Sequence, residues 1–326
     1  MRPFAYKSPS DVREAAAGSA EDNTALIAGG TTMIDLMKLE VLKPGQLVDL
    51  NNLPLRGIDL GSDGLRIGAL EKMSDVAANP KVTTNYPVIS EALLQSASAQ
   101  IRNMASMGGN LLQRTRCGYF RDVNTPCNKR QPGSGCPAIE GENRMHAILG
   151  TSSSCIATHP SDLAVALVAL EASIRLQSGN GSRDVKLDDF YLVPGDTPDM
   201  ENQLRPGEII AEIHVPPLAW ANKSTYLKIR DRASYEFALT SAAVALDVNG
   251  DKIRDARIAV GGVGTKPWNL PKVREALIGN PLNQETFEKA AKLATDGAKP
   301  TKQNAYKVEL IQRTIIRTLM NLGGVA

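Results

Sequence analysis

All four cysteines of this 326-residue chain lie in one irregular stretch between Arg114 and Asp162. Nine, eight and eighteen residues separate the successive cysteines, which are Cys117, Cys127, Cys136 and Cys155. The first half of the stretch is rich in Arg, Lys, Gly, Pro and Asn, and it shows neither helical nor strand periodicity. Any fold for this chain must therefore accommodate a long irregular segment with four sulfur ligands, which suggests a metal site.

Four chemical interpretations fit these cysteines. A 4Fe–4S cluster is favoured, because its four irons present vertices that are spread more widely than those of one tetrahedral ion. Structural zinc usually takes paired Cys-x2-4-Cys knuckles, and the sequence has none. Two disulfides are typical of small secreted domains that lack a core, and four unrelated free thiols are the remaining alternative. The negative charge of a thiolate cluster could be offset by the nearby cations Arg114, Arg116, Arg121, Lys129 and Arg130.

Composition argues against several classes of partner. Lys and Arg number 37 against 35 Asp and Glu, so no global field would recruit nucleic acid. The N-terminal stretch MRPFAYKSPS has no apolar core of a signal peptide, and the longest apolar run, 163–170, is too short to span a bilayer. We therefore expect a soluble chain without membrane insertion, either cytoplasmic or periplasmic through a partner's export signal.

A strand, a glycine turn and a helix follow one another near the start of the chain. Residues 24–28 read as a buried strand and 34–39 as a helix, with Gly-Gly-Thr-Thr-Met between them. Backbone N–H groups and Thr hydroxyls converge in such a corner, where they suit a phosphate. The pattern is neither a Rossmann fingerprint nor a P-loop, and an ordinary tight turn is the alternative.

A second donor-rich turn, 106–110, follows a helix predicted over 87–101. Two glycine turns in one domain could hold both ends of a diphosphate, although a plain turn is again the alternative. Further along, Asp162 starts a helix predicted over 163–170. Ser161 or Asp162 could simply cap this helix, or Asp162 could accept hydrogen bonds from ligand hydroxyls. We interpret His159, just before it, as structural.

Beyond a probable boundary at Pro216-Pro217 the chain alternates strands and helices. Strands are predicted over 224–229 and 254–261, and mixed strand and helix over 237–248. Amphipathic helices are predicted over 272–277, 284–295 and 302–322. This part therefore reads as an α+β lobe.

Six stretches in order resemble one known family: AGGTT, IRNMASMGGNL, HPSDLAVAL, LRPGEIIAEIHVP, KIRDRASYEFAL and IAVGGVGTKPW. The chain resembles, over nearly its whole length, the FAD-binding medium subunit of the xanthine dehydrogenase and molybdenum hydroxylase family. The cysteine-containing insertion between MGGNL and HPSD resembles a narrower branch, the FAD subunit of bacterial periplasmic aldehyde oxidoreductase. Since that branch carries an extra 4Fe–4S cluster, the resemblance implies that the four cysteines are its ligands.

The resemblance implies an α+β fold with a vanillyl-alcohol oxidase (PCMH)-type FAD-binding unit of two subdomains. The expected domains are FAD-binding subdomain 1 over 1–54, FAD-binding subdomain 2 over 55–217 with an iron–sulfur loop inserted at 113–156, and a C-terminal α+β domain over 218–326. Several relatives place an aromatic over the flavin from the helix before the second turn, whereas this chain has LLQSASAQ there. Which side chain shields the ring is therefore open.

Site residues carried over from the family form two groups around FAD, plus three single positions. The pyrophosphate would be wrapped by Leu26, Ile27, Ala28, Gly29, Gly30, Thr31, Thr32 and Met33. It would be closed on the other side by Ser106, Met107, Gly108, Gly109 and Asn110. Asp162 would meet ribityl or adenosine hydroxyls, Ile210 would lie against the flavin or adenine, and Lys228 would approach the isoalloxazine edge.

The resemblance also implies a three-subunit oxidoreductase. A large molybdenum-cofactor subunit would oxidise an aldehyde, and a small subunit with two 2Fe–2S clusters would relay electrons to FAD on this chain. An external acceptor would then receive them. This chain shows no molybdenum site and no catalytic residue of its own. The alternatives are the FAD subunit of a xanthine or N-heterocycle dehydrogenase, a stand-alone flavin oxidase, and a non-enzymatic metal-stapled scaffold.

Overall fold

The computed structural model describes residues 1–325, so the expected C-terminal domain 218–326 ends at a residue, Ala326, outside the described range. The strands are β1 (Ala5–Lys7), β2 (Thr24–Ile27), β3 (Gln46–Asp49), β4 (Ile58–Gly61), β5 (Gly64–Gly68), β6 (Ser173–Ser178), β7 (Gly181–Lys186), β8 (Ile209–Val215), β9 (Ser224–Ile229), β10 (Thr240–Asn249), β11 (Lys252–Gly261) and β12 (Trp268–Asn269).

Helices cover these strands in every part of the chain. They are α1 (Val12–Ser19), α2 (Met33–Lys38), α3 (Met73–Ala78), α4 (Pro80–Asn85), α5 (Pro87–Gln95), α6 (Ala99–Met104), α7 (Met107–Leu111), α8 (Gly118–Arg121), α9 (Asp162–Ala169), α10 (Leu187–Phe190), α11 (Pro271–Leu277), α12 (Gln284–Lys292) and α13 (Tyr306–Gly323), with two 3-10 turns at Pro137–Ile139 and Leu293–Thr295. None of the helices in the described range is both long and apolar enough to cross a bilayer.

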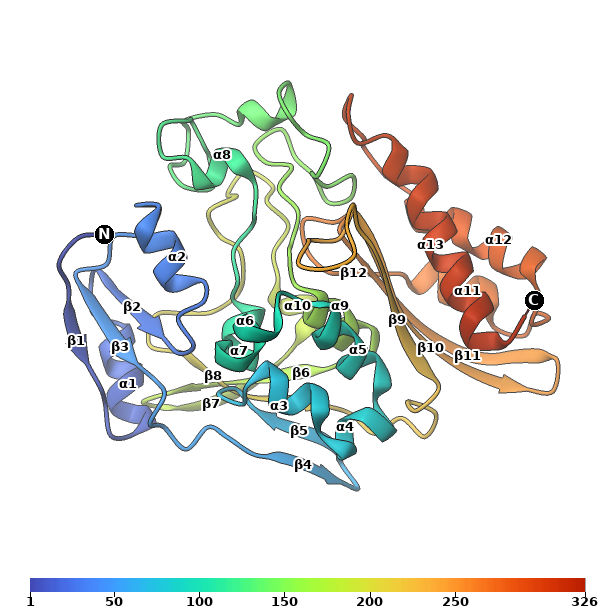
Figure 1. Cartoon of the computed structure of the whole chain (residues 1–326), viewed down its shortest axis with the longest axis horizontal. Helices are drawn as coiled ribbons and strands as arrows, with labels where there is room; N and C mark the ends of the chain where they lie inside the picture. The colour runs from blue at the N-terminus through green and yellow to red at the C-terminus, as the bar shows by residue number, and fades with distance from the viewer. Residues whose placement is uncertain (326) are drawn as a thin grey trace.

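Three sheets divide the molecule into three lobes along its length (Figure 1). The first lobe has a parallel sheet in the order β1-β3-β2. The second has an antiparallel sheet in the order β4-β5-β8-β6-β7, and the third an antiparallel sheet in the order β12-β11-β10-β9. The expected α+β class, with a two-part unit and a C-terminal lobe, is confirmed. The domain boundaries themselves stay a prediction; they fall in the connections between β3 and β4 and between β8 and β9.

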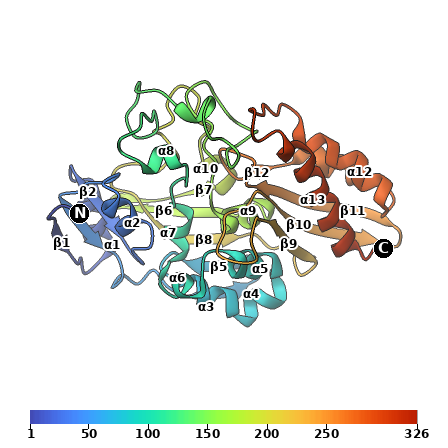
Figure 2. The same ribbon diagram turned by 45° about the horizontal axis from the view of Figure 1, so that its top comes forward.

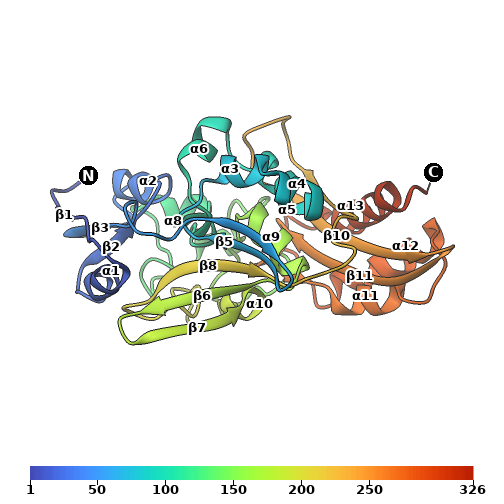
Figure 3. The ribbon, with the colours of Figure 1, turned by 90° about the horizontal axis from the view of Figure 1, so that it is seen from below.

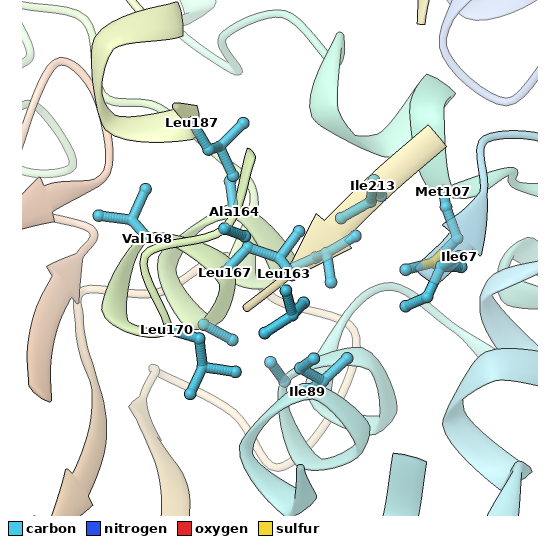
Figure 4. Packing of buried hydrophobic residues seen from close by; sticks show 14 of the residues in the cluster. Ile67, Ile89, Met107, Leu163, Ala164, Leu167, Val168, Leu170, Leu187 and Ile213 are labelled. Carbon is cyan, nitrogen blue, oxygen red and sulfur yellow. The ribbon is translucent and has the colours of Figure 1, made fainter. Parts of the chain in front are cut away.

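Helix α9 is the centre of the middle lobe, and every one of its residues is buried. Its apolar side chains pack with those of α5, α7 and the sheet, among them Ile89, Met107 and Ile213 (Figure 4). The hydroxyl of Ser161 caps the helix by accepting a hydrogen bond from the backbone N–H of Ala164 at 3.0 Å. Burial on all sides explains why the sequence shows a continuous apolar run here rather than an amphipathic pattern.

Strand β10 covers Thr240–Asn249 and no helix forms in the region predicted as mixed strand and helix, so the prediction for 237–248 is wrong in part. Its two faces contact α9 and α13, which lie in different lobes of the chain (Figure 3). A strand that is covered on both faces is apolar at every position, and such a run cannot be told from a buried helix by periodicity alone.

The single helix predicted over 87–101 is also wrong, because α5 and α6 are separate. Ala97 between them has a φ of +49°, which no helix accommodates. The hydroxyl of Ser96 bonds back to the carbonyl of Ala92, and Ser98 caps α6 by accepting from the N–H of Ile101. These two serines stop one helix and start the next.

The cysteine segment, residues 113–156, forms an irregular arch above α6 and α7, with only α8 and one 3-10 turn as regular structure (Figure 2). It contacts the first lobe through Asp35 on α2. It contacts the third lobe through a pair of reciprocal hydrogen bonds between Asn143 and Gln303. The segment therefore ties together lobes that are distant in the sequence.

Candidate functional site

The first glycine corner joins β2 to α2. A Cβ atom on Gly29 would lie 2.0 Å from the carbonyl oxygen of Met104, so only glycine allows the two backbones to approach this closely. Gly30 has a φ of +72°, in the left-handed region that favours glycine. Thr32 precedes α2 without a side-chain capping hydrogen bond. The corner therefore lines the cavity beside it with the backbone of the two glycines and with Thr32, whose hydroxyl is not engaged in capping α2.

The second corner, predicted as a donor-rich turn over 106–110, is the first turn of the short helix α7. Ser106 caps this helix by accepting a hydrogen bond from the N–H of Gly109 at 3.2 Å. A Cβ atom on Gly108 would lie 3.0 Å from the Cβ of Ala69, which makes this a tight position as well. Glycine here lets α7 lie close to the end of β5, at the edge of the same cavity.

The two corners are about eighty residues apart in the sequence, yet both line one cavity of about 440 Å³. The cavity is lined by eleven of the sixteen expected FAD residues: Leu26, Ala28, Gly29, Gly30, Thr31, Thr32, Met33, Ser106, Gly108, Gly109 and Ile210. Its chemistry suits a dinucleotide, because apolar side chains line it together with glycine backbone and the hydroxyl-bearing residues Thr31, Thr32 and Ser106. Sequence reasoning missed the turn at 205–208 and the side chains of Leu50 and Leu70, which line it as well.

Five of the expected FAD residues do not line this cavity: Ile27, Met107, Asn110, Asp162 and Lys228. Met107 is fully buried in the central core. The side chain of Asn110 accepts a hydrogen bond from Ser161 at 2.6 Å and is buried beside Met73. Met107 and Asn110 therefore support the second corner from behind, a role that the sequence motif alone does not separate from direct binding.

Asp162 lies beside a second cavity of about 550 Å³, bounded by the cysteine segment on one side and the third lobe on the other. Its carboxylate accepts three hydrogen bonds from buried side chains, at 3.0 Å from Ser96, 2.6 Å from Tyr226 and 2.8 Å from Lys228. Burial, followed by the charge of Asp162, raises the pKa of Tyr226, so that phenol remains a donor. In this arrangement Asp162 joins the middle lobe to strand β9 of the third.

Lys228 is directed at Asp162 and at the carbonyl oxygen of Gln95, 3.2 Å away, and it lines neither large cavity. Sequence reasoning placed the two residues independently near the flavin. The structure brings them together as an ion pair, which no local pattern indicates because 66 positions separate them.

His159 is half-buried and lies against the edge of the Tyr191 ring, with 4.5 Å between the ring centroids. Its backbone N–H donates to the carbonyl of Gly264, and its ring nitrogen Nδ1 accepts from the N–H of Ser161. Burial lowers the pKa of His159 to about 4. A neutral ring held by these contacts fits a structural role, which stays a prediction.

The cysteine segment folds so that all four thiols line one small cavity: Cys117, Cys127, Cys136 and Cys155. They form no disulfide. Among residues 1–325, no three His, Cys, Asp or Glu side chains converge as ligands on a single metal ion. The four thiols thus surround one shared space.

The surroundings of these thiols are apolar but provide backbone donors. Burial raises the pKa of Cys117 to about 11 and also raises the pKa of Cys136 and Cys155. The N–H of Ala157 donates to the sulfur of Cys155 at 3.4 Å. Sulfur ligands in iron–sulfur proteins accept such hydrogen bonds, so the donor set fits a cluster. Thiols that are protonated here would have to release their protons to bind metal.

The cations of the cysteine segment have acidic partners of their own. Glu201 pairs with Arg114 and Lys129, each at 3.0 Å, and Asp35 pairs with Arg116 and Arg121. Arg130 donates instead to three backbone carbonyls, including that of Phe120. Carboxylates from outside the segment thus pair with four of the five cations, and the suggestion that these cations offset the charge of a cluster stays a prediction. Lys129 still acts on the pKa of Cys155, which it lowers against the larger effect of burial.

Comparison with known proteins agrees with this geometry. Residues 2–218 match the FAD binding domain in molybdopterin dehydrogenase, and residues 225–322 match the CO dehydrogenase flavoprotein C-terminal domain. The fold and the glycine-lined cavity are thus those of an FAD-binding oxidoreductase subunit. The chain belongs to the molybdenum hydroxylase family, as one of its FAD-binding medium subunits.

Individual relatives span nearly the whole chain. It is 44% identical over 322 residues to the aldehyde oxidoreductase FAD-binding subunit of Escherichia coli (strain K12), covering 98% of each chain. It is 30% identical to the glyceraldehyde dehydrogenase medium chain of Sulfolobus acidocaldarius, covering 86% of this chain and 82% of that one. Carbon monoxide dehydrogenase from Hydrogenophaga pseudoflava is similar in structure, with a TM-score of 0.76 and 26% identity over 99% of this chain and 98% of that one.

Proposed function

We propose that this chain is the FAD- and 4Fe–4S-binding electron-transfer subunit of a molybdenum-containing aldehyde oxidoreductase. The observation that carries the proposal is the meeting of two distant glycine corners on one cavity, in a chain 44% identical over its length to an aldehyde oxidoreductase FAD-binding subunit. Relatives named for N-heterocycles match less well, such as a nicotine 6-hydroxylase medium subunit at 26% identity.

The glycine corners would hold the diphosphate of FAD. Gly29, Gly30 and Gly108 keep side chains out of the space, while Thr31, Thr32 and Ser106 add hydroxyls at its edge. Ile27, Met107 and Asn110 would support the two corners. Ile210 would lie against an aromatic ring of the dinucleotide, since it lines the same cavity. Bound FAD supplies redox chemistry that takes up electrons singly and releases one or two at a time.

Asp162 and Lys228 would bound the flavin end of the site. Asp162 lines the larger cavity, and Lys228 keeps a positive charge buried directly behind it. The pair also fixes the third lobe against the middle one, so it would set the width of the cavity between them.

A 4Fe–4S cluster would be bound by Cys117, Cys127, Cys136 and Cys155. Support comes from the shared cavity of the four thiols, the absence of disulfides among them and the backbone N–H donor at Cys155. The cluster would either tune and stabilise the cysteine segment or pass electrons onward, and we favour the first role.

The partners would be a large molybdenum-cofactor subunit, a small subunit with two 2Fe–2S clusters, and an external electron acceptor. Support comes from the relatives, which are medium chains or FAD subunits by name. The complex would be periplasmic by way of a partner's export signal, or cytoplasmic.

Replacing one cysteine tests both cofactor assignments together. In Cys136→Ser, purified with its partners, iron and acid-labile sulfide should fall while flavin absorbance is retained. Gln131→Ser is a matched control in the same segment, because Gln131 is exposed. Unchanged iron in Cys136→Ser would refute the cluster assignment, and wild-type protein without flavin would refute the FAD assignment.

A further inference from the structure

Three residues separate the four-cysteine cavity from the larger cavity that Asp162 lines. Cys117, Tyr119 and His146 are the residues that contribute to the lining of both. Any group in the cysteine cavity would therefore be divided from the larger cavity by these side chains. Of the three, His146 has no role in the site as described so far.

The ring of His146 contacts one of the four sulfurs directly. Its Nε2 atom lies 3.2 Å from Sγ of Cys117, within hydrogen-bond reach for sulfur. The side chain is buried, and the other ring nitrogen, Nδ1, has no hydrogen-bond partner within the described residues. A neutral imidazole carries a single N–H, on one of its two ring nitrogens.

The contact determines where that N–H is placed. A thiolate that binds metal can only accept a hydrogen bond, and Cys117 offers the acceptor to Nε2. An N–H on Nδ1 would be buried without an acceptor among residues 1–325, which is unfavourable. The tautomer with the proton on Nε2 donates a hydrogen bond to the sulfur. Only the lone pair of Nδ1 is then left without a hydrogen bond.

The backbone around His146 is held by the third lobe. Asn304 donates through its amide to the carbonyl oxygens of His146 and Ala147, at 3.3 and 3.2 Å. Lys307 donates to the carbonyl of Met145 at 3.1 Å and to that of Gly262 at 2.6 Å. Both donors are fully buried, and the ring is thus fixed from a part of the fold that is separate from the cysteine segment.

We propose that His146 is a positioning residue of the iron–sulfur site, whose ring N–H donates to the sulfur of Cys117, orients that ligand and raises the reduction potential of the cluster. The inference rests on the cluster assignment of the proposed function. A donor on a ligand sulfur stabilises the more negative, reduced state, and hydrogen bonds to sulfur are among the factors that set these potentials.

Two variants of the whole complex separate the hydrogen bond from the volume of the ring. His146→Leu removes the donor, and His146→Gln retains an amide donor near the position of Nε2. We expect the midpoint potential of the cluster, from redox titration followed by electron paramagnetic resonance, to shift to a more negative value in the leucine variant. The glutamine variant should lie closer to wild type. An unchanged potential in His146→Leu with full iron content would overturn the proposal.

A variant that loses its cluster has no potential to measure, so a second experiment uses the unmodified complex. With 15N-histidine labelling and exchange into D2O, the reduced cluster should show a histidine nitrogen coupling and an exchangeable deuteron. Absence of both couplings would overturn the role of His146. Wild-type complex with no iron or sulfide beyond that of its two 2Fe–2S clusters would instead refute the cluster assignment of the proposed function, so the two failures are distinct.

Discussion

The carboxylate of Asp162 and the ammonium group of Lys228 meet at 2.8 Å in a place where both side chains are almost completely buried. The pair joins the first turn of α9 to strand β9, and Ser96 and Tyr226 complete the hydrogen bonds of the carboxylate. Such a pair adds little net stability compared with a packed apolar pair, but its members depend strongly on each other, because an unpaired buried charge is very unfavourable.

Asp162→Asn should therefore destabilise the chain by about 3–5 kcal/mol, since the buried Lys228 would keep only neutral acceptors, such as the carbonyl of Gln95, and no compensating charge. The double variant Asp162→Asn/Lys228→Met should be more stable than Asp162→Asn alone, because it no longer buries an unpaired cation. Urea unfolding of the two single variants and the double variant measures this coupling. Strictly additive losses would show that the two side chains do not depend on each other.

Replacement of Gly30 should deplete bound FAD. Gly30→Val puts a β-branched residue at a φ of +72°, a left-handed conformation that L-residues adopt at a cost of roughly 1–2 kcal/mol, and adds atoms at the edge of the cavity. We expect the flavin-to-protein absorbance ratio to fall by more than half. Gly179→Val is the control, because Gly179 lies in the β6-β7 turn and an added Cβ there meets no atom closer than 3.8 Å. Equal flavin content in both variants would show that this corner is not part of the FAD site.

The glycine corners could be predicted because their information is local. A strand, two glycines and a helix are sufficient to indicate the first corner, and the structure explains Gly29 by its contact with the backbone at Met104. The four cysteines could be grouped because they share one segment, and they do line one cavity. What the cavity binds was suggested by chemistry and family resemblance rather than by geometry.

The remaining features depend on contacts between distant residues. The partners of Asp162 on β9 are 64 and 66 positions away, and no periodicity links them. Likewise, the acids that pair with the cations of the cysteine segment, Asp35 and Glu201, lie outside it. The break between α5 and α6 at Ala97 was missed because alanine is a strong helix former, and its positive φ is imposed by the surrounding packing.

Lys307 should make stability depend on pH. It is buried without a carboxylate partner among residues 1–325, and burial lowers its pKa from 10.5 to about 7. Between these values the unfolded chain binds the proton and the folded chain does not, so the free energy of unfolding rises with pH, at up to about 1.4 kcal/mol per unit. From pH 7 to 8.5 we expect this residue to contribute an increase of about 1–2 kcal/mol.

Lys307→Met is the matched comparison for this pH dependence. Methionine keeps an unbranched chain but has no proton to bind, so the slope attributed to Lys307 should disappear. Urea unfolding of wild type and variant at pH 7, 7.8 and 8.5 gives the difference directly. The stability of the variant relative to wild type should decrease as the pH rises, and parallel curves would exclude Lys307 as the source.

Asp35 should control how firmly the cysteine segment is attached to the first lobe. It lies on α2, directly after the first glycine corner, and pairs with Arg116 and Arg121 on either side of Cys117. Asp35→Asn should destabilise the chain by only about 1 kcal/mol, because the pairs are partly exposed and screened by solvent. It should nevertheless increase amide hydrogen exchange over 113–122, since this attachment is local. Glu21→Gln neutralises an exposed acid of the same lobe that pairs with Lys7, and it should leave exchange in that segment unchanged. Equal exchange in both variants would mean that the segment is held by its other contacts, with Glu201 and Gln303.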